Sequence, residues 1–223
     1  MGNEILGIPL SNIGLRESLR KINEFSESNG LNTVAYISAG KLVLASDNRE
    51  QRKWGSNLDL ILYEDKEVLR AVGITAPARI REVEENKFLK EMLRNLVRGQ
   101  REIFLLAQTW EEMEQLEEGL RKIQSSLCIV GKAVVEDYLQ RKESLINDIN
   151  FQAPQIILSK LPYPEGIRMM YEYGNYLNAS LWLGLPEKVN EEEKGGWLDK
   201  INKIMYKKLL NRMINHSKDT EKQ

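Results

Sequence analysis

The chain has 223 residues, 42% of them hydrophobic, which is enough apolar sequence for one globular domain with a well-buried core. Its 32 basic and 33 acidic residues nearly cancel, which argues against a nucleic-acid binder because such proteins need a clear basic excess. A single cysteine, Cys128, excludes an intrachain disulfide and favours a reducing compartment. We expect its side chain to be buried, because it lies in the apolar run LCIVG.

Neither end of the chain carries a signal for secretion or membrane insertion. The opening MGNEILGIPLS lacks a basic region and a long apolar stretch, and nowhere do 18 apolar residues follow one another. The sequence therefore predicts a cytoplasmic protein.

Short apolar runs alternate with helical patterns along the chain, as in a largely parallel sheet covered by helices. Several runs are apolar throughout, which indicates strands that are buried on both faces. We predict a three-layer α/β domain in which all seven runs join one mainly parallel sheet. The runs are residues 4–9, 32–38, 58–63, 102–108, 126–132, 154–160 and 179–185.

Two helices carry clear start or periodicity signals. Between the first two runs, apolar residues recur at helical spacing from Leu15 to Phe25, and Gly30 follows as a stop signal. After the fourth run, Thr109 with Glu112 three positions later is typical of a capping box that begins a helix.

Familiar nucleotide and metal motifs are not intact. Gly40 and Lys41 suggest a phosphate-binding loop, but that motif needs Gly at position 35 and Ser or Thr at position 42, where Ala35 and Leu42 stand. With His216 as its one histidine, the chain lacks the main component of common catalytic triads and zinc sites. We therefore expect no metal and no cofactor.

Two adjacent acids, Glu64 and Asp65, follow the apolar run of residues 58–63. Carboxylates at the carboxyl end of a buried strand can form a catalytic site, or they can begin the next helix, where the macrodipole favours acids in the first turn. We interpret the pair as a helix start and keep both acids as the candidates for a catalytic base.

The order of short phrases along the chain resembles that of a known family. ILGIPLSNIGLRESLRKINEF is similar to an ILG-P-D strand and turn followed by an amphipathic helix. AGKLVLASDNREQRKWGSNLDLILYED is similar in layout to ANPEIVMLARKDPEYRKILNEADLVVPDG. REIFLLAQT, LCIVGKA and INDINFQAPQIILSKLPYPEG are similar to VFLLGG, IVGTHHG and INASKPDILFVGLGSPKQE. From about residue 4 to the C-terminal helix, the chain resembles the bacterial WecG/TagA/CpsF glycosyltransferases, glycosyltransferase family 26.

The resemblance implies a Rossmann-like fold and an inverting, metal-independent reaction. The family transfers N-acetylmannosamine or a related sugar from a UDP-sugar to an undecaprenyl-diphosphate-linked acceptor. Its PDG motif supplies the general base and corresponds here to Tyr63, Glu64 and Asp65. A glycine permits a left-handed turn, which we expect Asp65 to tolerate poorly at that position.

Other positions that the resemblance assigns to substrate binding also differ from the family pattern. The Asn of ANP corresponds to Ala39, the second Gly of LLGG to Gln108, and the GSPKQE segment to residues 162–167, which include Tyr163. Apolar phrases that build the fold persist while the polar phrases of the site are replaced. We expect most UDP-sugar affinity to be lost.

The C-terminal part is basic and amphipathic. Lys207, Lys208 and Arg212 flank an apolar face that includes Ile204 and Met205, and the resemblance implies membrane attachment and phosphate contact for this region. The alternative is a helix that packs on the domain or on a second subunit. We predict a Rossmann-like domain in residues 1–185, a polar linker in 186–196, a helix in 197–216 and a disordered tail in 217–223.

Two functions stay open at this point. The first is a degenerate family homologue that acts as a non-catalytic partner or regulator in cell-surface polysaccharide biosynthesis, with an active glycosyltransferase paralogue or a second copy as its partner. The second is an active glycosyltransferase with Glu64 or Asp65 as base. In either case we expect a cytoplasmic protein that can bind the anionic inner face of the membrane through residues 197–216.

Overall fold

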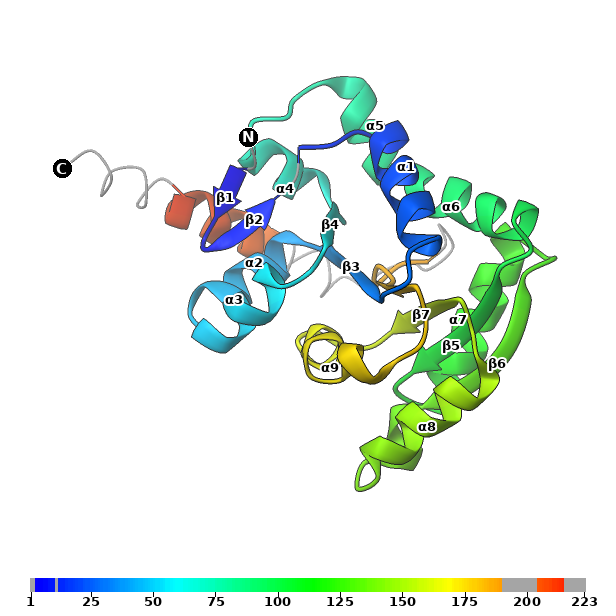
Figure 1. Ribbon diagram of the computed structural model, residues 1–223. Helices are drawn as coiled ribbons and strands as arrows, with labels where there is room; N and C mark the ends of the chain where they lie inside the picture. The colour runs from blue at the N-terminus through cyan, green and yellow to red at the C-terminus, as the bar shows by residue number, and fades with distance from the viewer. Residues whose placement is uncertain (1–2, 11, 190–203, 215–223) are drawn as a thin grey trace.

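The computed structural model describes residues 3–10, 12–189 and 204–214. Within them the chain forms a six-stranded, all-parallel sheet with the strand order β4-β3-β8-β7-β5-β6. The predicted α/β class with a parallel sheet is confirmed (Figure 1). The strands are β3 (Asn32–Ile37), β4 (Leu60–Tyr63), β5 (Glu102–Ala107), β6 (Cys128–Val134), β7 (Ile156–Lys160) and β8 (Leu181–Gly184).

Helices cover both faces of the sheet and give the three layers of a Rossmann-like fold. Apolar side chains of α1, α6 and α7 pack on one face, and those of α2, α4, α8 and α9 pack on the other (Figure 1). The helices are α1 (Leu15–Ser26), α2 (Ala39–Ser46), α3 (Arg49–Ser56), α4 (Lys66–Ala71), α5 (Pro77–Glu84), α6 (Lys87–Arg98), α7 (Trp110–Ile123), α8 (Lys142–Gln152) and α9 (Glu165–Tyr173), with short 3₁₀ turns at Val135–Tyr138 and Gly174–Tyr176.

Two local predictions about helices agree with the structure. The periodic apolar positions after Leu15 lie in α1, which ends at Ser26, before Gly30. Thr109 is the N-cap of α7, and its side chain accepts a hydrogen bond from the Glu112 N–H. Each signal was local, so no tertiary information was needed to find it.

The prediction of a seventh strand in the main sheet is wrong. Residues 4–9 do not form one strand; instead β1 (Asn3–Ile5) and β2 (Ile8–Leu10) pair antiparallel in a separate two-stranded sheet. Leu6 and Gly7 between them both have positive φ, at 54° and 79°, which is the backbone of a tight two-residue hairpin turn. The apolar run concealed this turn, because leucine rarely adopts a positive φ.

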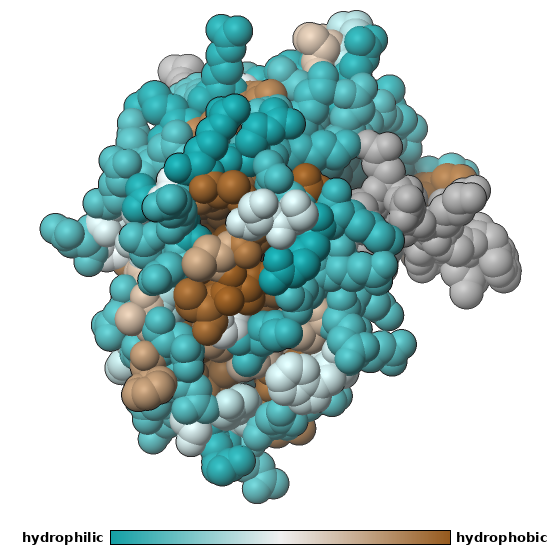
Figure 2. All heavy atoms as spheres, turned by 90° about the vertical axis from the view of Figure 1, so that its right-hand side faces the viewer, coloured by the Kyte–Doolittle hydropathy of each residue, from teal (hydrophilic) through white to brown (hydrophobic). Residues whose placement is uncertain are grey.

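The expected burial of Cys128 is also wrong, since its side chain is exposed. Its strand, β6, is the last in the sheet order and pairs with β5 alone. The side of the molecule where β6 forms the margin of the sheet carries an apolar area rimmed by hydrophilic side chains (Figure 2). The edge position of β6, which the sequence did not reveal, therefore explains why Cys128 is exposed although it lies in an apolar run.

At the centre of the sheet, the Trp182 indole N–H donates to the Ser159 hydroxyl oxygen at 2.9 Å, and both residues are 1% exposed. Trp182 lies on β8 and Ser159 on β7, so the bond joins neighbouring central strands. A buried polar group that loses its partner costs about 1–3 kcal/mol, so each of these groups needs the other.

We predict that Trp182→Phe and Ser159→Ala each lower the free energy of unfolding by at least about 1 kcal/mol, because each leaves a buried polar group unpaired. The double variant should lose less than the sum of the two, by about 0.5–2 kcal/mol. Urea unfolding followed by circular dichroism gives all three values. Strictly additive losses would contradict the account of this pair.

Candidate ligand pocket

A cavity of about 1700 Å³ opens at the carboxyl ends of β3, β4, β7 and β8. Its lining includes Ser38 after β3, Glu64 after β4, Leu161 after β7 and Leu185 after β8, together with Tyr206 from the C-terminal helical segment. Parallel strands bring their carboxyl ends to one edge of the sheet, and this edge is where open α/β sheets bind ligands. The fold thus places a ligand-sized space where its topology predicts one.

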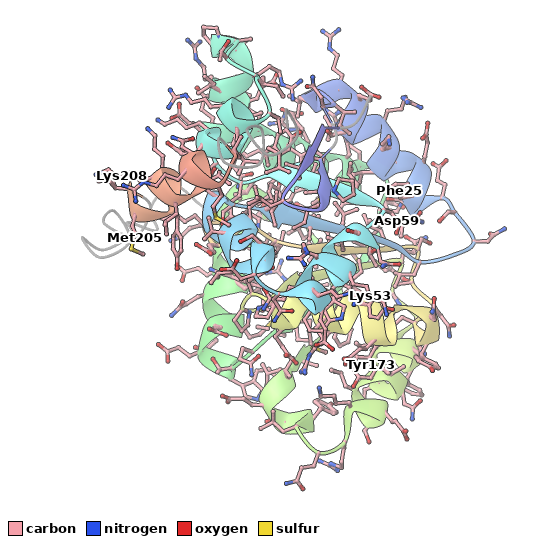
Figure 3. The ribbon with its side chains drawn as sticks, turned by 90° about the vertical axis from the view of Figure 1, so that its left-hand side faces the viewer. Phe25, Lys53, Asp59, Tyr173, Met205 and Lys208 are labelled. Atoms are coloured by element: carbon pink, nitrogen blue, oxygen red, sulfur yellow. The ribbon has the colours of Figure 1, made fainter. Side chains whose placement is uncertain are left out.

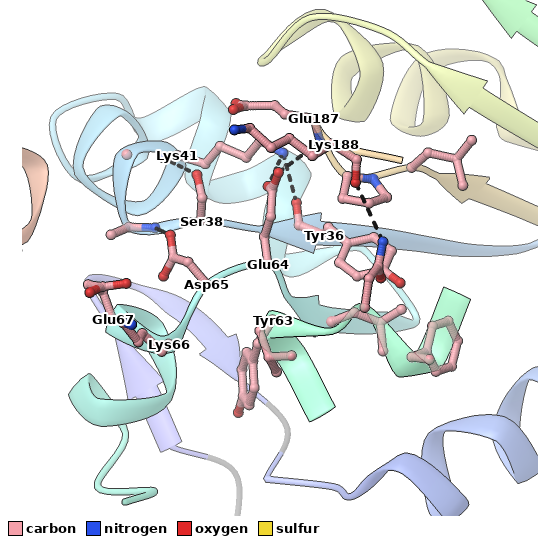
Figure 4. A pocket seen from close by; sticks show the side chains of 18 of the residues that line it. Tyr36, Ser38, Lys41, Tyr63, Glu64, Asp65, Lys66, Glu67, Glu187 and Lys188 are labelled. Carbon is pink, nitrogen blue, oxygen red and sulfur yellow. Dashed lines mark hydrogen bonds and ion pairs between the residues drawn. The ribbon is translucent and has the colours of Figure 1, made fainter. Parts of the chain in front are cut away.

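Glu64 lies in this cavity with both carboxylate oxygens engaged (Figure 4). Oε2 accepts from Lys41 Nζ at 2.7 Å, and Oε1 accepts from the main-chain N–H of Glu187 at 2.8 Å. The ammonium of Lys41 also donates to the carbonyl oxygen of Tyr36 at 3.3 Å. The side chains of Lys41 and Glu64 are each 12% exposed, so the ion pair is largely shielded from water.

Asp65 caps α4, in agreement with its interpretation as a helix start, whereas Glu64 precedes the cap and its carboxylate bonds to Lys41 and the Glu187 N–H instead. Asp65 Oδ1 accepts from the N–H of Val68 and its Oδ2 from the N–H of Ala39, both at 2.9 Å. It therefore joins the start of α4 to the start of α2. Burial raises the pKa of the Asp65 carboxyl, and the two main-chain N–H donors oppose this effect. Its backbone is extended, with φ −137°, so the expected strain of a left-handed turn at Asp65 is absent.

The other predicted site residues lie at different distances from the cavity. Ala39 and Tyr163 line it; Ala39 is 4% exposed, and burial raises the pKa of Tyr163 to about 12. Gln108 follows β5, and among the described residues it is not part of the lining. The main-chain carbonyl oxygen of Gln108 accepts a hydrogen bond from the N–H of Glu136 at 3.2 Å, which holds the ends of β5 and β6 together. The structure thus groups Ala39 and Tyr163 with the two acids but leaves Gln108 apart.

Residues 204–214 are helical and pack on the domain. Leu210 is 1% exposed within the apolar cluster beside α2 and α4, and the Tyr206 ring lies against Gly40, where an added Cβ would approach it to 3.2 Å. Ile204 and Met205, which belong to the predicted apolar face, are 58% and 45% exposed. For this segment, the alternative of a helix packed on the domain describes the structure.

The three basic residues of this segment point to different surroundings. Lys207 lines the cavity, whereas Lys208 and Arg212 are exposed outside it, and Lys208 and Met205 project from the surface in Figure 3. The predicted helical residues Trp197, Leu198, Ile201 and His216, most of the predicted linker (190–196) and the predicted tail (217–223) lie outside the described residues.

Sequence reasoning missed Lys41 and the main chain of Glu187 as members of the site. Lys41 was tested only as a phosphate-loop lysine, although it begins a helix after β3, the strand that pairs with β4. That adjacency places its ammonium beside Glu64, and pairing between strands is not readable from one sequence. A main-chain donor such as the Glu187 N–H carries no sequence signal.

The described residues contain no group of three or more His, Cys, Asp or Glu side chains that could hold a metal ion. The cavity lining contains basic residues, including Lys160, Lys188 and Arg79, and acids, including Glu64 and Glu67. Ammonium groups and main-chain N–H donors are the kinds of partner that an anionic ligand can use.

The all-parallel sheet covered by helices, with a large cavity at the carboxyl ends of its strands, is a Rossmann-like architecture, in which ligands commonly bind at this edge of the sheet. The sequence model of the glycosyl transferase WecG/TagA/CpsF family matches residues 3–187, which includes every strand of the sheet. The chain therefore belongs to the WecG/TagA/CpsF glycosyltransferase family. No curated protein matches it.

The raised pKa of Asp65 predicts a pH dependence of stability that Asp65→Asn removes. Between the unfolded and folded pKa values, the folded chain retains a proton that the unfolded chain has lost, so stability falls as pH rises. The excess stability of the wild type over Asp65→Asn should therefore decrease over the interval from about pH 4, the ordinary pKa of Asp, to the raised pKa of the folded chain. Urea unfolding of both proteins at several pH values measures it, and an excess that increases over this interval would contradict the assignment.

Proposed function

We propose that this chain acts in cell-surface polysaccharide biosynthesis as a catalytically degenerate member of its family, a partner or regulator that does not itself transfer a sugar. Family membership supports the glycosyltransferase-like role in polysaccharide biosynthesis. The observation that carries the loss of catalysis is that both oxygens of Glu64 and both of Asp65 accept hydrogen bonds from the protein itself.

A general base must bring a carboxylate oxygen within hydrogen-bonding distance of the acceptor hydroxyl. Glu64 faces Lys41 and the Glu187 N–H, and Asp65 faces the ends of two helices. Releasing Glu64 would leave the shielded ammonium of Lys41 unneutralised, which costs about 3–5 kcal/mol in comparable buried pairs. Releasing Asp65 would uncap α4, at about 1 kcal/mol. Both free-energy costs disfavour the use of either carboxylate as a catalytic base.

The residues that replace the family's polar groups support the same conclusion. Ala39 lines the cavity but offers no polar side-chain atom, and its N–H already donates to Asp65. Tyr163 puts an aromatic ring where the resemblance places donor contacts, and Gln108 lies away from the cavity lining described above. Several lost contacts at about 1 kcal/mol each would remove most affinity for a UDP-sugar.

One observation favours the second candidate, an active inverting UDP-sugar glycosyltransferase with an undecaprenyl-diphosphate-linked acceptor. The cavity is about 1700 Å³, above the usual range for small-molecule sites of about 300–1000 Å³, and its lining includes Lys160, Lys188 and Arg79. A pocket of this size could hold a nucleotide sugar. In that case Glu64 or Asp65 would act as base after a rearrangement.

The surface of residues 204–214 supports a peripheral location. Ile204 and Met205 are exposed on the same helical segment as the exposed basic residues Lys207, Lys208 and Arg212, and Ile204 and Lys207 also line the cavity. Such a surface suits the anionic inner face of a membrane, and an active paralogue or a second copy of the chain could bind there as well. Across the described part of the chain, no helix is long and apolar enough to span a membrane.

The proposed loss of catalysis predicts that the wild-type protein binds neither UDP nor UDP-N-acetylhexosamines at micromolar concentration and forms no product with a polyprenyl-diphosphate acceptor. Calorimetric titration measures nucleotide binding, and a product assay measures sugar transfer. Turnover that Glu64→Gln or Asp65→Asn abolishes would establish the active-enzyme alternative, with the affected carboxylate as base.

The proposed membrane contact predicts that Lys207→Glu/Lys208→Glu weakens binding to vesicles containing anionic lipid by roughly tenfold or more, since each basic residue near such a surface contributes about 1 kcal/mol. Arg16→Glu/Arg20→Glu on α1 makes the same change in net charge at exposed positions and serves as the control. Co-sedimentation measures binding. Equal losses in the two double variants would show that net charge, not this surface, governs it.

A further inference from the structure

The cavity contains the donors of an anion site, and the chain fills that site with its own carboxylate. Lys41 Nζ and the Glu187 N–H approach the two oxygens of Glu64 at 2.7 and 2.8 Å (Figure 4). A cation and a main-chain N–H converging on one group is how proteins commonly hold phosphate and carboxylate ligands. We infer that Glu64 is an internal, competing occupant of this anion site and keeps it closed to phosphate-bearing ligands.

The surroundings of Lys41 indicate why the site would accept an external anion. Its side chain is 12% exposed, and the ammonium also donates to the neutral carbonyl oxygen of Tyr36 at 3.3 Å. Without the Glu64 carboxylate, the ammonium would be a shielded charge with no counter-charge at contact distance among the residues that the structure describes. An anion from solution then gains the attraction that Glu64 now supplies, because a shielded charge is costly when it is unpaired.

The ligand class follows from the donors and the space. The cavity of about 1700 Å³ is lined by Lys41 and Glu64 and also by Lys160 and Lys188, and a diphosphate carries more than one charge for such ammonium groups to meet. This step rests on the proposed function, because it takes the family pocket as the place where this chain binds its ligand.

Glu64 also fastens the segment of residues 185–189, which follows β8 and borders the cavity. The Leu185 N–H donates to the Ser159 carbonyl oxygen at 2.7 Å and Val189 is 1% exposed, so the two ends of the segment are anchored on the fold. Between them, the Glu187 N–H donates to Glu64, and the Lys188 carbonyl oxygen accepts from the Asn86 side-chain amide at 3.5 Å. An anion that displaces Glu64 therefore replaces it as the partner of the Glu187 N–H. Occupancy of the pocket is thereby coupled to the mobility of residues 185–189.

The test is calorimetric titration of the full chain with inorganic diphosphate. We expect weak binding by the wild type, and affinity roughly tenfold or more higher for Glu64→Ala, which empties the site. Glu64→Gln should lie between the two, because its amide oxygen can still accept from a donor but carries no charge. Equal affinities of wild type and Glu64→Ala, with both proteins folded by circular dichroism, would overturn the inference.

Two further variants separate the site from a general change in charge. Glu84→Gln removes the same unit charge from an acid that lines the cavity but pairs with Lys66, at side-chain exposures of 46% and 38%. It should change affinity by less than about threefold, since an exposed pair is worth little. The double variant Glu64→Ala/Lys41→Met should return to weak binding. A gain in Glu84→Gln equal to that in Glu64→Ala, or tight binding by the double variant, would overturn the inference.

Hydrogen exchange at the Glu187 amide gives a second readout. Exchange should be faster in Glu64→Ala than in the wild type, stay near the wild-type rate in Glu64→Gln, and slow again when diphosphate binds to Glu64→Ala. Unchanged exchange in Glu64→Ala would contradict the fastening role. UDP-sugar turnover by the wild type would contradict the proposed function instead, so the two failures are distinguishable.

Discussion

The pocket depends on one constraint: two adjacent carboxylates at the carboxyl end of β4 are shielded from water and must be satisfied by the protein. Asp65 meets it with the N–H groups that begin α2 and α4, and Glu64 meets it with Lys41 and the segment after β8. These contacts join β3, β4 and β8 through the segments that follow them. The edge of the sheet at which α/β proteins commonly bind ligands is thereby held together by acids.

This arrangement links the fold to the proposed loss of catalysis. A carboxylate whose two oxygens both accept hydrogen bonds from the fold is held in place, so turning it toward a substrate hydroxyl would cost those contacts. The same contacts make Glu64 an internal competitor for anions, because its partners are the kinds of donor that a phosphate group uses. The hydrogen bonds of Glu64 thus have two consequences. They stabilise the structure, and they keep the anion site occupied.

The sequence allowed the fold class, the parallel sheet, the α1 pattern and the α7 cap to be predicted, because all depend on local periodicity or on neighbouring residues. It failed where tertiary position decides. The Leu6–Gly7 turn converted an expected strand into a hairpin, and the edge position of β6 left Cys128 exposed. At the site, Asp65 could be identified as a helix start from its position alone. The pairing of Glu64 with Lys41 could not, because it requires knowing that β3 and β4 are neighbours.

The C-terminal helical segment shows the same division between local and tertiary information. Its helical character and basic residues were evident, but the residues that face the domain were not, because contact with the domain selects them: Leu210 is buried in the apolar cluster that includes α2, and the half-buried Tyr206 lies against Gly40. Ile204 and Met205 stay exposed, and Ile204 also lines the cavity. The sequence pattern of a membrane-binding helix and that of a packed helix overlap here, and this segment has features of both.

The most direct test of the central claim is a crystal structure of the wild-type protein grown with saturating UDP. The account predicts that Glu64 remains within hydrogen-bonding distance of Lys41 and the Glu187 N–H, that Asp65 still caps α4, and that no nucleotide is bound. A bound UDP with either carboxylate released from these partners and turned toward the open cavity would contradict it.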